Sequence, residues 1–239
     1  MENIIEEKIE IEIQNANFKL KGSIYRDPAT NGRQSWIINL PGFLEHRESK
    51  FVKYFSERFA RAGYYVLSYD YRAHGETSKE TGKNWLKYFP QIVSDIHLVI
   101  NWIIENRSDY LKNGDIFLFG RSFGGVIILS HGYKDERAKK LISLCTRYDY
   151  HSYKKVPFPE KIIKAISPIY FLEKNDLNKK RIYLAHCKDD QQIPFENLNL
   201  IKEHLGLPSQ NVLIFDNGGH SFKNHREEVF SKSLEFLKS

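Results

Sequence analysis

Cysteine and long apolar runs are both scarce in this chain of 239 residues. Only Cys145 and Cys187 are present, and their separation fits neither a metal site nor a redox motif, so we expect two buried thiols and no disulfide framework. No stretch of about 18 apolar residues occurs, and the first residues lack a basic segment followed by an apolar one. We therefore expect a cytoplasmic protein that does not insert into membranes.

Signatures of several other protein classes are missing as well. The chain contains no P-loop, no G-x-G-x-x-G after its first strand, no H-E-x-x-H pair and no cluster of Cys and His, so we expect neither a metal nor a cofactor. The formal net charge is +6, but Lys and Arg are scattered in pairs instead of forming one basic block. We therefore expect no nucleic-acid partner, whereas a homodimer stays open.

Short apolar runs alternate with segments of helical spacing along most of the chain. Six such runs predict strands inside a parallel sheet: Trp36 to Leu40, Tyr64 to Tyr69, Ile116 to Phe119, Leu141 to Cys145, Ile182 to Ala185 and Val212 to Phe215. Five segments predict helices: Phe51 to Ala62, Phe89 to Glu105, Phe123 to Tyr133, Phe195 to Leu205 and His225 to Leu237. This alternation predicts a single α/β domain over residues 1–239, with a mostly parallel, doubly wound sheet of about eight strands and helices on both faces.

The ends of this pattern are less regular. Alternating apolar residues at Ile9, Ile11 and Ile13, and again from Phe18 to Tyr25, predict an antiparallel edge hairpin joined through Gln14 to Asn17. Residues 146–180 form a longer insertion than a helical crossover needs, and they are rich in Tyr, Phe, Ile and Pro. We expect this insertion to bury its aromatic groups as a small cap, and the alternative is a plain helix against the side of the sheet.

The strongest local motif is the run from Gly120 to Gly125, which reads G-R-S-F-G-G and lies between a predicted strand and a predicted helix. The pattern G-x-S-x-G in this context is a nucleophile elbow, in which flanking glycines permit a tight turn that exposes the serine hydroxyl. Ser122 is therefore the candidate nucleophile. The alternative is a glycine-rich turn in which Ser122 only caps a helix.

A serine hydroxyl needs a base to take its proton, and that base needs a third group to orient it. His220 follows the last predicted strand and two glycines, which places it at the same edge of the sheet as Ser122. Three other histidines lie near strand ends, namely His46, His74 and His186. Asp189 and Asp190 follow the preceding strand in the required chain order, either could orient the histidine, and Asp149 is a third candidate.

With these residues the chain resembles the α/β-hydrolase family, and within it the small cytoplasmic esterases and the serine-aminopeptidase-like group. The family motif H-G-x-x-D-x-x-V-P falls on His186 to Pro194, with Cys187 in place of the glycine, and this resemblance favours Asp190 as the acid. The run Leu40-Pro41-Gly42-Phe43 is similar to the family's H-G-F, which implies that the backbone N–H groups of Phe43 and Phe123 form the oxyanion hole.

The run Tyr69 to Ser78 is similar to the family's D-x-R-G-H-G-x-S, and we interpret it as a structural turn; the alternative is that His74 or Arg72 contacts substrate.

The function predicted from these residues is a serine hydrolase, most simply a carboxylesterase. A peptidase, a thioesterase or an acyltransferase would use the same triad of Ser122, Asp190 and His220, and a non-catalytic scaffold of the same fold is the alternative outside enzymes. We expect a small-molecule ester or related acyl substrate. Tyr150, Tyr153 and Phe158 of the insertion are candidates for substrate binding, in a compact aromatic pocket that favours short acyl or aryl esters.

Overall fold

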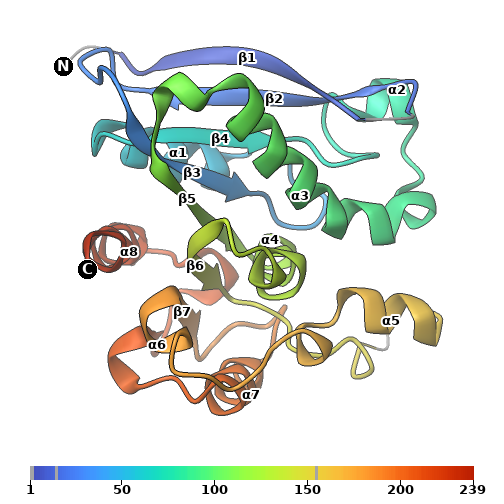
Figure 1. Ribbon diagram of the computed structural model, residues 1–239. Helices are drawn as coiled ribbons and strands as arrows, with labels where there is room; N and C mark the ends of the chain where they lie inside the picture. Colours follow the sequence, from blue (N-terminus) through green and yellow to red (C-terminus); the bar gives the residue numbers. More distant parts are fainter. Residues whose placement is uncertain (1–2, 14–15, 154–155) are drawn as a thin grey trace.

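The computed structural model describes residues 3–13, 16–153 and 156–239, and within them eight strands form one sheet in the order β1-β2-β4-β3-β5-β6-β7-β8 (Figure 1). The strands are β1 (Ile5–Glu12), β2 (Lys19–Arg26), β3 (Gln34–Leu40), β4 (Tyr65–Tyr69), β5 (Leu111–Arg121), β6 (Ala138–Leu144), β7 (Ile182–Cys187) and β8 (Val212–Phe215). β2 pairs antiparallel with both β1 and β4, and every pairing from β4 to β8 is parallel. This is the mostly parallel, doubly wound sheet of the α/β-hydrolase fold.

The helices cover both faces of this sheet, as the doubly wound pattern requires. They are α1 (Lys50–Arg61), α2 (Ser78–Thr81), α3 (Phe89–Asn106), α4 (Phe123–Ile127), α5 (Glu160–Ile166), α6 (Asn178–Arg181), α7 (Glu196–Leu205) and α8 (Arg226–Lys238). In Figure 1, α8 lies on one side of the sheet, and α3 and α4 lie on the other. None of the helices in the described ranges combines the length and the apolarity needed to cross a bilayer.

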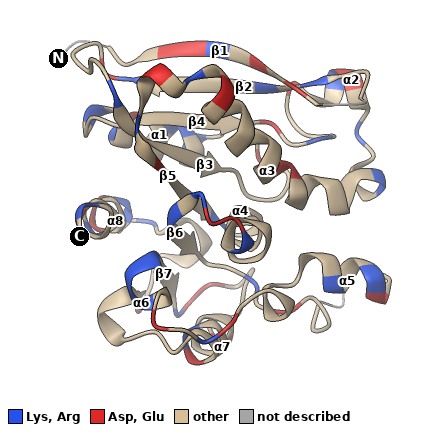
Figure 2. Ribbon diagram, in the orientation of Figure 1, with Lys and Arg blue, Asp and Glu red and all other residues tan. Residues whose placement is uncertain are grey.

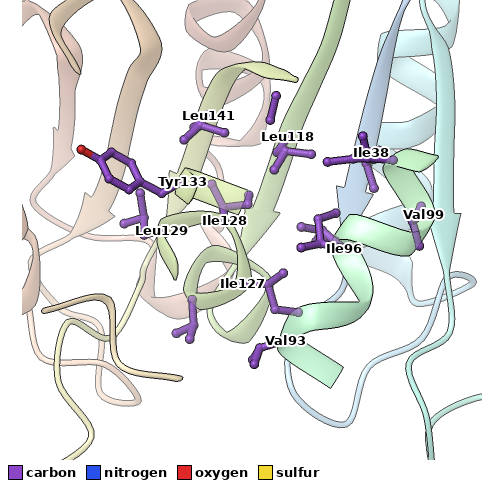
Figure 3. Packing of buried hydrophobic residues seen from close by; sticks show 14 of the residues in the cluster. Ile38, Val93, Ile96, Val99, Leu118, Ile127, Ile128, Leu129, Tyr133 and Leu141 are labelled. Carbon is purple, nitrogen blue, oxygen red and sulfur yellow. The ribbon is translucent and has the colours of Figure 1, made fainter. Parts of the chain in front are cut away.

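Successive residues of the buried strands point to opposite faces and supply two separate cores. Ile38 packs on the side of α3, α4 and α7, whereas Ile37 packs on the side of α1 and α8. Figure 3 shows Ile96 of α3 facing Ile38 of β3 and Ile127 of α4. Each core is continuous along the sheet, which explains why the central strands are apolar on both faces.

The predicted strands and helices are confirmed in type, with three differences in detail. β8 is an edge strand and not an interior one, and its Ile214 is 43% exposed because it has a sheet neighbour on one side only. The helix predicted over Phe123 to Tyr133 is α-helical only to Ile127, and a π-helical turn over Ile128–Gly132 completes it. The predicted hairpin is present as β1 and β2, while Gln14 and Asn15 of its connection lie outside the described residues.

Charged side chains of both signs are distributed over the whole molecule. Figure 2 shows Lys and Arg interspersed with Asp and Glu along the strands and helices. The excess of six positive charges is therefore not gathered on one element.

The carboxyl ends of the parallel strands meet at one edge of the sheet, where the chain packs very closely. A Cβ atom on Gly124 would lie 2.3 Å from the backbone oxygen of Leu40, and a Cβ on Gly120 would lie 3.0 Å from the same atom. Only glycine permits this approach of β5 and α4 to the end of β3. The close approach brings the loops after β3 and β5 together, and the candidate site lies there.

Candidate active site

Ser122 lies in the tight turn between β5 and α4. Its backbone has φ 58° and ψ −116°, which is the left-handed side of conformational space and costs a non-glycine residue about 1–3 kcal/mol. Two hydrogen bonds hold this turn: the N–H of Ser122 donates to the Leu144 carbonyl at 2.8 Å, and the N–H of Val126 donates to the Ser122 carbonyl at 3.0 Å. The strained backbone therefore belongs to a fixed turn, and the Ser122 side chain borders a cavity.

His220 lies in a short 3₁₀ helix, Gly219–Ser221, in the loop after β8. Its ring Nδ1 is 2.7 Å from Oδ2 of Asp190, so an N–H at Nδ1 donates to the carboxylate and Nε2 is left as the acceptor. Asp189 has a different partner, because its carboxylate accepts the backbone N–H groups of Gly218 and Gly219 at 3.2 and 2.8 Å. Of the two adjacent acids, Asp190 therefore contacts the ring and Asp189 holds the loop that carries it.

The Asp190 carboxylate is buried and fully hydrogen-bonded. Its Oδ1 accepts the N–H groups of Gln192 and Ile193 at 2.8 and 3.0 Å, while its Oδ2 lies 3.3 Å from Nε2 of His186 as well as next to His220. Burial alone would raise the pKa of Asp190, but the hydrogen bonds from His186, His220 and the Ile193 amide hold that pKa well below its usual range. Asp190 therefore stays ionised throughout the neutral range.

Ser122 and His220 border the same cavity, but no hydrogen bond joins their side chains in the described structure. In enzymes without bound substrate, a bond between nucleophile and base is often long and tightens only in the complex. The present arrangement thus orients the ring through Asp190 and leaves Nε2 without a hydrogen-bond partner among the described residues.

Phe43 and Phe123, whose backbone N–H groups are the expected oxyanion hole, both lie next to the turn that carries Ser122. Phe123 is the first residue of α4, where helical N–H groups have no partner within the helix, and Phe43 lies in the loop after β3. Both residues line the cavity beside Ser122. Two fixed donors beside a nucleophile can stabilise an oxyanion that forms on a bound acyl group.

A partly buried ion pair, which no sequence pattern predicted, links this loop to the loop that carries His220. Glu45 accepts the N–H of Gly42 at 2.8 Å through Oε2, and its Oε1 lies 2.5 Å from Nη2 of Arg121. Arg121 also donates to Oγ of Ser221 at 2.9 Å and to the backbone oxygen of His220 at 3.3 Å. Arg121, the residue directly before Ser122, thus connects the loops after β3 and β8. In the sequence, the one indication of this contact is that a charged residue stands inside a motif that is otherwise uncharged.

The cavity has a volume of about 510 Å³ and is bordered by aromatic and charged side chains. In this lining the Phe89 ring stacks on the rings of Phe123 and Phe158, with ring centroids 5.2 and 5.0 Å apart. Tyr150 and Tyr153 of the insertion line the cavity beside Phe158, and burial raises the pKa of Tyr150 above its ordinary value. The three candidate substrate-binding residues therefore share one wall of the cavity that contains Ser122. Trp85, Arg147 and Gln192 line the same cavity, and no pattern in the sequence predicted this.

The other residues singled out in the sequence lie elsewhere or have structural partners. Arg72 forms two hydrogen bonds of 2.7 Å with the buried Asp95, and His74 is bonded to the Arg72 carbonyl, as expected of a structural turn. Asp149 pairs with His151. His186, considered among the histidines, lies instead behind the acid, where its Nε2 also donates to the Ile193 carbonyl at 3.0 Å.

One cluster in the described residues has the composition of a metal site. Ligand atoms of Cys145, Asp190 and His220 lie within 4.8 Å of one another. Burial, together with the nearby Asp190 charge, raises the pKa of the Cys145 thiol well above its ordinary value, so the sulfur keeps its proton and is a poor ligand. Asp190 and His220 are already bonded to each other, and the cluster is better described as an acid–histidine pair with a thiol packed against it.

Comparisons with known proteins agree with this fold. A family model described as serine aminopeptidase, S33 matches residues 33–190, a range that includes Ser122 and Asp190 and ends before His220. An uncharacterized 31.7 kDa protein of the traX-finO intergenic region of Escherichia coli is 32% identical over 120 residues, which is 50% of this chain and 40% of that protein. The chain thus aligns with less than half of the length of this relative.

Solved structures resemble the whole chain. An acylaminoacyl peptidase from Pyrococcus horikoshii superposes with a TM-score of 0.78 at 16% identity, covering 100% of this chain and 42% of that one. Est1E from Butyrivibrio proteoclasticus, solved with ferulic acid bound, superposes with a TM-score of 0.77 at 17% identity, covering 96% of this chain and 97% of that one. At such identities the similarity shows a shared fold and nothing finer.

The different partners of the two adjacent acids predict different effects of their substitution. Asp190→Asn should lower kcat by about 10⁴-fold, because an amide at this position holds the imidazole in the wrong tautomer. Asp189→Asn keeps an oxygen that can accept from Gly219 and should cost about tenfold or less, as expected for one weakened hydrogen bond. Steady-state hydrolysis by the two variants checks the ranking, and the reverse order would place the acid one residue earlier.

The ionised state of Asp190 can also be tested through the pH dependence of protein stability. The pKa of Asp190 is lower in the folded chain than the unfolded value of about 3.9, so its ionised form contributes stability above that value and loses it as the pH falls toward the folded pKa. Denaturant unfolding should therefore show the largest free-energy difference between the original protein and Asp190→Asn near neutral pH, and a shrinking one below about pH 4. A difference that does not change with pH would contradict the ionised, paired state.

Proposed function

Because the chain belongs to the serine aminopeptidase S33 family of α/β-hydrolases, we propose that it is a serine hydrolase that cleaves short acyl or aryl carboxylic esters through an acyl-enzyme on Ser122. The observation that carries this proposal is the 2.7 Å hydrogen bond between Asp190 and His220 at the edge of the cavity that Ser122 borders. An ionised, buried acid on Nδ1 is what a histidine needs to act as a base through Nε2.

In the proposed reaction, Oγ of Ser122 attacks the ester carbonyl carbon while Nε2 of His220 takes its proton. The carbonyl oxygen becomes an oxyanion that accepts hydrogen bonds from the backbone N–H groups of Phe43 and Phe123. Collapse of this intermediate expels the alcohol, which receives the proton from His220, and leaves the acyl group on Ser122. Water, deprotonated by His220, then attacks the acyl-enzyme, and collapse of this second intermediate releases the acid while Oγ of Ser122 takes back the proton from His220.

Asp190 remains ionised through both halves of this cycle and stabilises the imidazolium form of His220 as it appears. The ion pair of Arg121 and Glu45 fixes the positions of the loops that carry Phe43 and His220. No step uses a metal or a cofactor.

The size and lining of the cavity support the proposed substrate class. About 510 Å³ bordered by Phe89, Phe158, Tyr150 and Tyr153 suits a short acyl chain or an aryl ring better than a long lipid chain. A peptidase, thioesterase or acyltransferase would use the same triad. Acylaminoacyl anilides and acyl thioesters, assayed beside p-nitrophenyl esters, distinguish these reactions.

The nucleophile can be tested by labelling and turnover. A fluorophosphonate should modify the protein once, at Ser122, and Ser122→Ala should stay folded, lose the label and lose about six orders of magnitude in kcat, as when a triad nucleophile is removed. The exposed Ser152 provides a matched control, and Ser152→Ala should keep both labelling and activity. Undiminished labelling of Ser122→Ala would end the proposal.

The role of the insertion can be tested by substrate chain length. Against esters of two to sixteen acyl carbons, kcat/KM should be highest for short chains, because each methylene that the cavity cannot bury forgoes about 0.8 kcal/mol. Changing Tyr150, Tyr153 and Phe158 together to alanine should move the profile toward longer chains, whereas Tyr170→Ala, an exposed residue of the same insertion, should not. A preference for the longest chains, or an unchanged profile in the triple variant, would reject the insertion as the specificity element.

A further inference from the structure

Arg147 is a buried cation in the wall of the candidate active site. It follows β6 by three residues, at the start of the insertion, and is only 7% exposed. It lines the same cavity as Ser122 and His220. Its guanidinium lies over the rings of Tyr153 at 4.9 Å and Tyr150 at 5.8 Å, which fixes the group against the aromatic wall.

No carboxylate of the described residues pairs with Arg147. Its one hydrogen bond to the described residues runs from Nη2 to the backbone oxygen of Gln192, at a long 3.4 Å. The other two buried arginines are paired: Arg47 with Asp70 and Arg121 with Glu45. Arg147 therefore differs from them in the described structure, since no carboxylate of the described residues pairs with its guanidinium.

A buried charge without a counter-ion is costly, and buried charges in folded proteins are as a rule paired. Among the residues that border the cavity, Arg121 and Arg147 are the cations and Glu45 is the one acid in the described lining. Glu45 is engaged by Arg121, and the ionised Asp190 behind the lining is engaged by His220 and by the Gln192 amide. The Arg147 guanidinium is therefore the cation of the described lining that is left to bind an anionic group of a ligand.

We propose that Arg147 binds a carboxylate on the substrate, so that the preferred esters are anionic: half-esters of dicarboxylic acids or esters of hydroxy-carboxylic acids. This inference rests on the proposed function and narrows it. A planar guanidinium matches a carboxylate through two parallel hydrogen bonds, and a carboxylate brings one negative charge to this one guanidinium. A phosphate monoester, with a charge approaching −2, would leave about one negative charge without a cationic partner in the described lining.

Two pairs of substrates isolate the effect of charge on each side of the ester. Phenyl hydrogen adipate and phenyl methyl adipate differ by a carboxylate on the acyl side, whereas 4-acetoxybenzoate and methyl 4-acetoxybenzoate differ by one on the leaving group. For each pair the measured quantity is the ratio of kcat/KM for the charged ester to that for the neutral ester. The original protein should give a ratio above about 10 for one of the pairs, since a hydrogen bond to a charged group contributes about 1.5–3 kcal/mol.

Substitutions of Arg147 then test the origin of that ratio. Arg147→Gln should lower it at least tenfold, Arg147→Lys should retain a large part of it, and Lys139→Gln, which removes a charge from an exposed position, should leave it unchanged. Benzoate, but not benzamide, should inhibit the original protein competitively, a measurement that does not depend on any variant folding. Thermal unfolding confirms that each variant is folded before its ratio is read.

A ratio that stays within twofold in folded Arg147→Gln, neutral esters preferred in both pairs, or equal inhibition by benzoate and benzamide would overturn the assignment of Arg147. Failure of the proposed function as a whole would give different experimental results. In that case a fluorophosphonate does not label Ser122 and none of the four esters is hydrolysed, whereas a labelled protein that hydrolyses neutral esters without regard to charge refutes the role of Arg147 alone.

Discussion

The hydrogen bond between Asp190 and His220 is the interaction on which the rest of the site depends. It joins the loops after β7 and β8, two neighbouring parallel strands whose carboxyl ends meet at one edge of the sheet. The carboxylate can remain charged in a buried position because backbone N–H groups of Gln192 and Ile193 and the ring of His186 share its charge. Without that support burial would favour the protonated acid, which could not orient the imidazole or stabilise its charged form.

The remaining parts of the site are held in place by packing and by one ion pair. Gly124 lets the first turn of α4 lie against the backbone at the end of β3, so that the amides of Phe43 and Phe123 can flank Ser122. Arg121 and Glu45 then connect the loop after β3 to the loop that carries His220. Under the proposed function these contacts hold the candidate donors and the candidate base relative to Ser122 before substrate binds, and such preorganisation is what gives fixed dipoles their catalytic value.

Much of the fold and the position of each triad candidate could be predicted because they depend on local patterns: apolar runs for strands, glycines around Ser122, and glycines before His220. β8 was placed inside the sheet because its apolar run resembles those of buried strands, and nothing local distinguishes an edge strand of this kind. The roles of Glu45, Arg121 and Arg147 could not be predicted, because an arginine paired across 76 residues and one left unpaired in a cavity look alike in a sequence. The contact of His186 with the Asp190 carboxylate could not be predicted from local spacing either, because it depends on the three-dimensional fold.

Direct detection of the covalent intermediate tests the central claim, that Ser122 activated by the Asp190–His220 pair carries the acyl group during turnover. Acid quenching of the protein during hydrolysis of a p-nitrophenyl ester, followed by peptide mass spectrometry, should find the acyl group on the peptide that contains Ser122. The adduct should be absent from His220→Ala, which lacks the base. Hydrolysis that proceeds without any adduct at Ser122, or an adduct located on another residue, would contradict the claim.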